Sequence, residues 1–134
     1  MGKWILSSVL CAALAFACGG GKGGGGSSGV SGSKQIIDLD AAERSQVCEF
    51  LADVLGPERT VDCGGGETRG VGGEASECVA EFTSLAMNAP GCTITVGQYE
   101  TCIEALANLS DAQICADDFP AACAPLLASE CLGE

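Results

Sequence analysis

Cysteine offers the most chemistry in this sequence, since ten of its 134 residues are cysteines. Thiols can catalyse redox reactions, bind zinc or form disulfides, and their spacing distinguishes these uses. Eight cysteines lie from residue 35 onward: Cys48, Cys63, Cys78, Cys92, Cys102, Cys115, Cys123 and Cys131. The nearest two are eight residues apart, so the close pairs typical of thiol oxidoreductases and zinc sites are missing. We therefore predict that these eight cysteines form structural disulfides, with the pairing left open.

The remaining side chains offer no catalytic constellation. The sequence contains no histidine, which excludes nucleophile systems that pair serine or cysteine with histidine. Three carboxylate pairs could in principle serve a glycosidase or a calcium site: Asp38 and Asp40, Glu77 and Glu81, and Asp117 and Asp118. None of these pairs lies in a D-x-D-x-D-G loop with a downstream glutamate, and helix capping and solvation explain them. We predict no catalytic residue, no metal ligand and no cofactor, so the protein is expected not to be an enzyme.

The charge of the chain is strongly one-sided. Six basic residues stand against 18 acidic ones, which gives a formal net charge of −12. All the acidic residues lie at or after Asp38, whereas three of the six basic residues lie at or before Lys34. A negative field of this kind repels nucleic acid and favours solubility. We therefore expect no nucleic-acid partner.

The N-terminal residues have the pattern of an export signal. Lys3 precedes the run WILSSVLCAALAFA, residues 4–17, which is apolar apart from two serines. A membrane-spanning helix needs about 20 residues, so this run is too short. Small residues, Ala15 and Ala17, end it at the positions that signal peptidases read. We predict a signal peptide over residues 1–17.

The next residue suggests a lipid anchor. The segment LAFAC, residues 14–18, resembles the lipobox of bacterial lipoproteins, although Leu14 lies one position further from the cysteine than is usual. In that family a diacylglycerol is attached to the thiol, cleavage occurs just before the cysteine, and the new amino group is acylated, commonly by palmitate. The resemblance implies that Cys18 is lipidated and holds the protein at a membrane. In that family, an aspartate directly after the lipidated cysteine signals retention at the inner membrane. This chain has Gly19 at that position, so the resemblance implies a location at the outer membrane. Cleavage after Ala17 by an ordinary signal peptidase, giving a secreted protein, is the alternative.

A glycine-rich stretch follows the cysteine. Residues 19–34 contain nine glycines and four serines and cannot bury enough apolar surface to fold. We predict that Cys18 and this stretch, residues 18–34, form a flexible tether between the lipid and a cysteine-rich helical domain over residues 35–134. As a coil, the 16 residues after Cys18 would span roughly 22 Å.

Helical signals recur throughout the predicted domain. Capping boxes begin at Asp40, Thr95 and Ser110, each with Glu or Gln three residues later. Apolar residues at helical spacing predict helices from Asp40 to Gly56, over about 74–87 and about 95–109, with a short turn after Ser110. A last helical piece is expected over 120–132, either continuous or broken at Pro125. The glycine-rich segment 63–73 is expected to be a mobile loop. The predicted fold is all-α, a small bundle of about four short helices held by disulfides. If residues 123–131 form one helix, Cys123 and Cys131 lie about 12 Å apart and must pair elsewhere.

One internal segment bears on function. The ten residues MNAPGCTITV, 87–96, resemble part of the elicitins, small helical disulfide-bridged proteins that carry sterols; the elicitin pattern has six cysteines. This resemblance implies a carrier of a small apolar ligand, such as a lipid. The first expectation remains a lipid-anchored protein of the cell envelope, with a structural or interaction role and an unknown protein partner. Binding of a small apolar ligand is the alternative.

Overall fold

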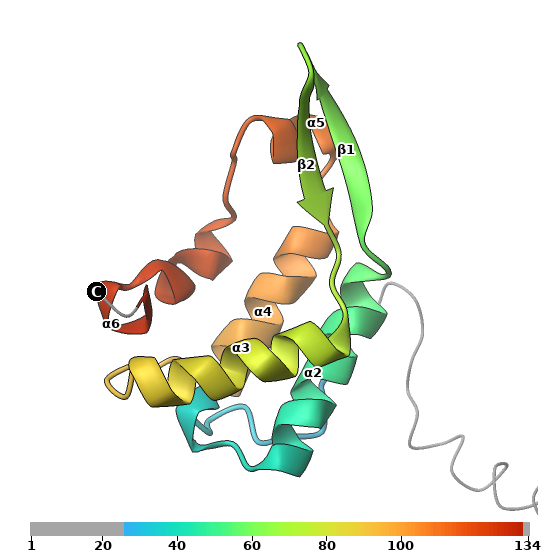
Figure 1. The fold of residues 1–134 in the computed structure, drawn as a ribbon. Helices are drawn as coiled ribbons and strands as arrows, with labels where there is room; N and C mark the ends of the chain where they lie inside the picture. The colour runs from blue at the N-terminus through green and yellow to red at the C-terminus, as the bar shows by residue number, and fades with distance from the viewer. Residues whose placement is uncertain (1–25, 133–134) are drawn as a thin grey trace, which may run out of the picture.

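The computed structural model describes residues 26–132. Three helices build the core of this part of the chain. Helix α2 (Ala41–Leu55) packs against both α3 (Ala75–Asn88) and α4 (Val96–Ala107) (Figure 1). The large apolar side chains buried between them are Val47, Phe50, Phe82, Tyr99 and Ile103. The predicted signal peptide, Cys18 and the first part of the predicted tether lie outside the described residues.

The three predicted capping boxes are confirmed. They begin α2, α4 and the short helix α5 (Asp111–Cys115). In each box the N-cap side chain accepts the backbone N–H of the third helical residue, whose own side chain accepts the N-cap N–H. These contacts satisfy donors that the first turn of a helix otherwise leaves without partners. Local sequence therefore fixes where these helices start.

The C-terminal segment is two short helices, and the break lies at Ala128 instead of at Pro125. A 3₁₀ helix, η2 (Ala121–Leu127), contains Pro125 and is followed by α6 (Ser129–Leu132). Ala128 between them has an extended backbone with ψ of 138°. A further 3₁₀ turn, η1 (Ile36–Asp38), precedes α2 and packs against α3.

The all-α prediction is wrong for the segment between α2 and α3, which forms a β-hairpin. Strand β1 (Arg59–Gly64) pairs antiparallel with β2 (Glu67–Val71), and the hairpin lies at one end of the molecule (Figure 1). The expected mobile loop over 63–73 is therefore also wrong. The turn is formed by Gly64, Gly65 and Gly66, whose φ values are 84°, 62° and 87°. Glycine adopts positive φ values without strain. Val61, 3% exposed, anchors β1.

The eight cysteines of the domain join in four disulfides, so the predicted disulfide bonding is confirmed. Two bridges link helices directly: Cys48–Cys78 joins α2 to α3, and Cys102–Cys123 joins α4 to η2. Cys92–Cys131 joins the turn after α3 to α6. Cys63–Cys115 joins the hairpin to α5. Each bridge thus connects elements that are separate in the sequence.

Candidate functional site

Residues 28–34, which we call the strap, lie along the N-terminal end of α4. The carbonyl of Lys34 accepts the N–H of Val96 at 2.9 Å, and the carbonyl of Gly32 accepts the N–H of Gly97 at 2.9 Å. The first N–H groups of a helix have no partner within it. The strap therefore supplies acceptors that α4 lacks.

Two further contacts hold the strap. Val30 is only 8% exposed and belongs to the hydrophobic core. The backbone N–H of Ser28 donates to Oε1 of Glu100 at 2.8 Å. The prediction of a flexible tether over residues 18–34 is therefore wrong for the strap, because these residues bond to the domain instead of remaining a free coil. Composition alone missed them, since a single valine in a Gly/Ser stretch gives no periodic signal.

An ion pair connects the strap to α2. Nζ of Lys34 lies 2.6 Å from Oε2 of Glu43, which also accepts the backbone N–H of Asp40 in the capping box at 2.9 Å. The hydrogen bond from Lys34, followed by that from the Asp40 backbone, lowers the pKa of Glu43 below its ordinary value. One carboxylate thus serves both the start of α2 and the attachment of the strap.

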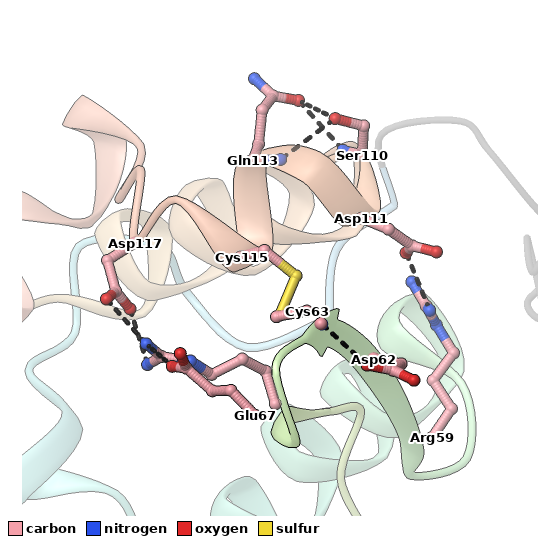
Figure 2. The surroundings of a disulfide bond; sticks show 11 residues. Arg59, Asp62, Cys63, Glu67, Ser110, Asp111, Gln113, Cys115 and Asp117 are labelled. Atoms are coloured by element: carbon pink, nitrogen blue, oxygen red, sulfur yellow. Dashed lines mark hydrogen bonds and ion pairs between the residues drawn. A yellow bond between two sulfur atoms is a disulfide. The ribbon is translucent and has the colours of Figure 1, made fainter.

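Strands β1 and β2 together with α5 form what we call the hairpin–α5 unit. The Cys63–Cys115 disulfide joins its two parts, and α5 packs against β1 (Figure 2). None of its residues belongs to the core cluster of the described chain. The unit is therefore an appendage to the helical core.

Ion pairs flank this disulfide on the surface (Figure 2). Arg59 donates to Asp111 at 3.0 Å. The guanidinium of Arg69 makes two contacts with the carboxylate of Asp117, at 2.7 and 2.8 Å, and one with Glu67 at 2.7 Å. Sequence reasoning missed the pairs to Asp111 and Asp117, because their partners lie 52 and 48 residues away and no local pattern marks them.

An apolar hollow of about 190 Å³ lies between α3, α4 and the C-terminal helices. Its lining contains one buried phenol, Tyr99, which stacks edge-on against Phe82 with ring centroids 5.0 Å apart. Burial, with a smaller effect of the Glu81 carboxylate, raises the pKa of Tyr99. The side chains around the hollow are Ile36, Glu81, Phe82, Leu85, Cys92, Ile94, Tyr99, Leu126 and Cys131.

The carboxylate pairs noted in the sequence have structural roles or lie exposed. Asp40 caps α2 and Asp117 pairs with Arg69, while Glu77 and Glu81 are exposed on α3. Within residues 26–132, no three acidic or cysteine side chains gather as a group that could hold a metal ion.

The described helices are all too short or too polar to cross a membrane. Comparison of the chain with protein-family models, curated proteins and solved structures gave no match.

Proposed function

We propose that this is a lipid-anchored protein of the cell envelope, attached through Cys18, with a structural or interaction role and no enzymatic one. Four disulfides fit an exported protein, since such bonds form and persist in oxidising compartments. The lipid at Cys18 and the outer-membrane location rest on the resemblance of residues 14–18 to a lipobox.

The four disulfides are the observation that carries export, and the fastening of the strap to α4 sets how far an anchor at Cys18 would hold the domain from the membrane. This fastening fixes the point at which the chain leaves the domain, at Ser28 beside Glu100. Nine residues, 19–27, then separate Cys18 from the strap. A coil of nine residues would span roughly 16 Å, enough to clear lipid headgroups while keeping the domain close to the bilayer.

Substitution of the cysteine that is proposed to carry the lipid tests the anchor. Cys18→Ser should move the protein from the membrane to the soluble fraction and remove the mass of the acyl groups. Cys11→Ser, seven residues earlier and within the apolar run that precedes Cys18, is the matched control and should remain at the membrane. Unchanged membrane association of Cys18→Ser would overturn the anchor.

The hairpin–α5 unit is the proposed contact surface, because it extends from the core and exposes both strands. A photo-crosslinking residue at Thr68, exposed on β2, should give a discrete crosslinked species in the expressing cells. The same residue at Ser45, exposed on α2, is the control and should give none. Equal crosslinking at both positions, or none at either, would contradict this surface.

A second candidate function, binding of a small apolar ligand, is favoured by the hollow beside Tyr99. Its volume of about 190 Å³ is close to that of an engineered cavity of about 150 Å³ that holds benzene, and lies below the usual range for drug-sized ligands. A hollow of this volume can take up a single ring and is too small to enclose a sterol. Benzene should therefore shift the NMR signals of Phe82 and Leu85 in the parent protein, and Leu126→Trp, which fills the hollow, should abolish the shifts.

A further inference from the structure

The four disulfides differ in their access to solvent. Cys102 and Cys123 are 1% and 0% exposed, and Cys48 and Cys78 are 0% and 4% exposed. Cys92 is fully buried, and its partner Cys131 packs against the core. Cys63 and Cys115, by contrast, are both half-buried and lie outside the core. Among the described residues, this is therefore the only bridge in which neither cysteine is buried, whereas in Cys92–Cys131 only Cys131 is half-buried.

Little else joins the hairpin to α5. The Arg59–Asp111 pair involves side chains that are 50% and 65% exposed, and the Arg69–Asp117 pair involves side chains that are 37% and 64% exposed. Exposed pairs of this kind contribute about 0–1 kcal/mol each and are weakened by salt. Val61 is the one strand residue of the hairpin that is buried. The disulfide is thus the main connection between the two parts of the unit.

We propose that Cys63–Cys115 is a thiol–disulfide exchange site, opened by a dithiol reductant while the other three bridges stay closed. A reductant thiolate attacks one of the two sulfurs, forms a mixed disulfide with it and releases the other cysteine as a thiolate, which takes up a proton. The second thiol of the reductant, as its thiolate, then displaces the remaining cysteine. The protein gains two electrons and two protons, and the reductant leaves as a disulfide.

The charges around the bridge indicate which reductants it accepts. Four carboxylates, Asp62, Glu67, Asp111 and Asp117, surround it (Figure 2). Only two guanidinium groups pair with them, that of Arg59 with Asp111 and that of Arg69 with Asp117 and Glu67. This excess of negative charge repels an anionic thiol such as glutathione more than a neutral or cationic one. The preferred partner is therefore a dithiol in neutral or basic surroundings.

Opening the bridge releases the hairpin from α5 without breaking a covalent link of the core. The exchange itself stands independently of the proposed function. Its consequence rests on that function, since the hairpin–α5 unit is the proposed contact surface. Reduction would then disturb that surface and leave the membrane anchor intact.

Partial reduction tests the site in the purified, oxidised protein. Dithiothreitol is added at equimolar amounts, free thiols are trapped with N-ethylmaleimide, and the labelled cysteines are mapped by peptide mass spectrometry. Cys63 and Cys115 should be labelled at least about tenfold faster than the other six, as expected when access limits attack. The helical circular dichroism should persist. Earlier or simultaneous opening of another bridge, or loss of helical signal with the first opening, would overturn the proposal.

The charge preference has its own test. The rate of opening per thiolate, taken relative to the rate of the same thiol with a small neutral disulfide, should fall in the order cysteamine, 2-mercaptoethanol, glutathione, and the differences should shrink at high salt. Glu67→Gln should reduce the difference in opening rate between cysteamine and glutathione, whereas Glu49→Gln, on α2, should leave this difference unchanged. Equal relative rates for the three thiols, or the same effect of both variants, would rule out the proposed electrostatic selection.

Discussion

At the scale of single residues, the pKa of Tyr99 reports on its burial in the core. It is the only tyrosine in the sequence, is 8% exposed, and its hydroxyl has one hydrogen-bond partner among the described residues, the sulfur of Cys78 at 3.8 Å. A disulfide sulfur is a weak acceptor, so ionisation of this phenol gains little from its surroundings and loses its hydration.

We predict that Tyr99 ionises only well above its ordinary pKa of 10.0 in the folded protein. Absorbance of the phenolate near 295 nm measures this directly, since no other tyrosine contributes. In denaturant the midpoint should return to about 10. Because the folded-state pKa is raised, this group contributes stability that is complete below pH 10 and is lost as the pH rises further.

The same titration separates the two causes of the raised pKa. Burial is the larger cause, so Glu81→Gln should lower the midpoint only slightly. Glu77→Gln, one turn earlier on α3, should not change it. A midpoint near 10 in the folded parent protein would contradict the burial of Tyr99.

A second residue-scale prediction concerns Gly72, which follows β2. Its φ is 109°, and a Cβ there would lie 2.6 Å from the carbonyl oxygen of Pro57 and 2.8 Å from Cα of Glu58. Gly72→Ala should therefore lower the free energy of unfolding by about 2 kcal/mol or more, through backbone strain and steric overlap. Urea denaturation measures the loss. Gly91→Ala is the control, because no atom lies within 4 Å of its Cβ position, and it should change stability by less than about 0.5 kcal/mol.

At the scale of elements, the helices were predictable and the hairpin was not. The capping boxes at Asp40, Thr95 and Ser110 are local signals, and the structure uses all three. The hairpin has one buried apolar residue, Val61, so alternation along β1 gives almost no signal. Its bridge to Cys115 spans 52 residues, and a spacing pattern cannot specify such a partner. Helix capping depends on residues within one turn and can be predicted from the sequence, whereas strand pairing and disulfide pairing depend on the assembled fold.

The strap gives a prediction at the same scale. Val30→Ala should lower the free energy of unfolding by about 1–2 kcal/mol, because it removes buried apolar surface. It should also speed hydrogen exchange at the N–H groups of Val96 and Gly97, which the strap carbonyls accept. Ser33→Ala, at an exposed position of the strap, is the control for both measurements. Unchanged exchange in Val30→Ala would mean that the strap is held without its buried valine.

At the scale of the whole molecule, disulfides supplement a modest apolar core. The chain has four phenylalanines, and one of them, Phe119, is 58% exposed. The bridges close loops with sequence separations of 30, 52, 39 and 21 residues. Each is worth about 3–4 kcal/mol if it acts by restricting the unfolded chain, against a typical net stability of about 5–15 kcal/mol. Covalent links can thus sustain a fold that also carries a large excess of negative charge.

That excess charge gives the last prediction. Three of the four basic side chains within residues 26–132, Lys34, Arg59 and Arg69, form ion pairs, and most acidic side chains there have no ion-pair partner. Raising sodium chloride from about 10 to 200 mM shortens the screening length from about 30 Å to below 10 Å and weakens the repulsion. The few surface ion pairs also weaken, but each is worth about 0–1 kcal/mol, so the net effect should be stabilising.

Urea unfolding of the oxidised protein at the two salt concentrations measures this effect, with the midpoint expected to rise. Combining Glu49→Gln, Asp53→Asn and Glu77→Gln removes three exposed charges from α2 and α3. This variant should be more stable than the parent at low salt, and the difference should shrink at high salt, because screening removes the same repulsion. A parent midpoint that falls with salt would show that the ion pairs, including Lys34 with Glu43, outweigh the repulsion. The acidity would then favour the folded state through specific pairs, instead of opposing it through the general field.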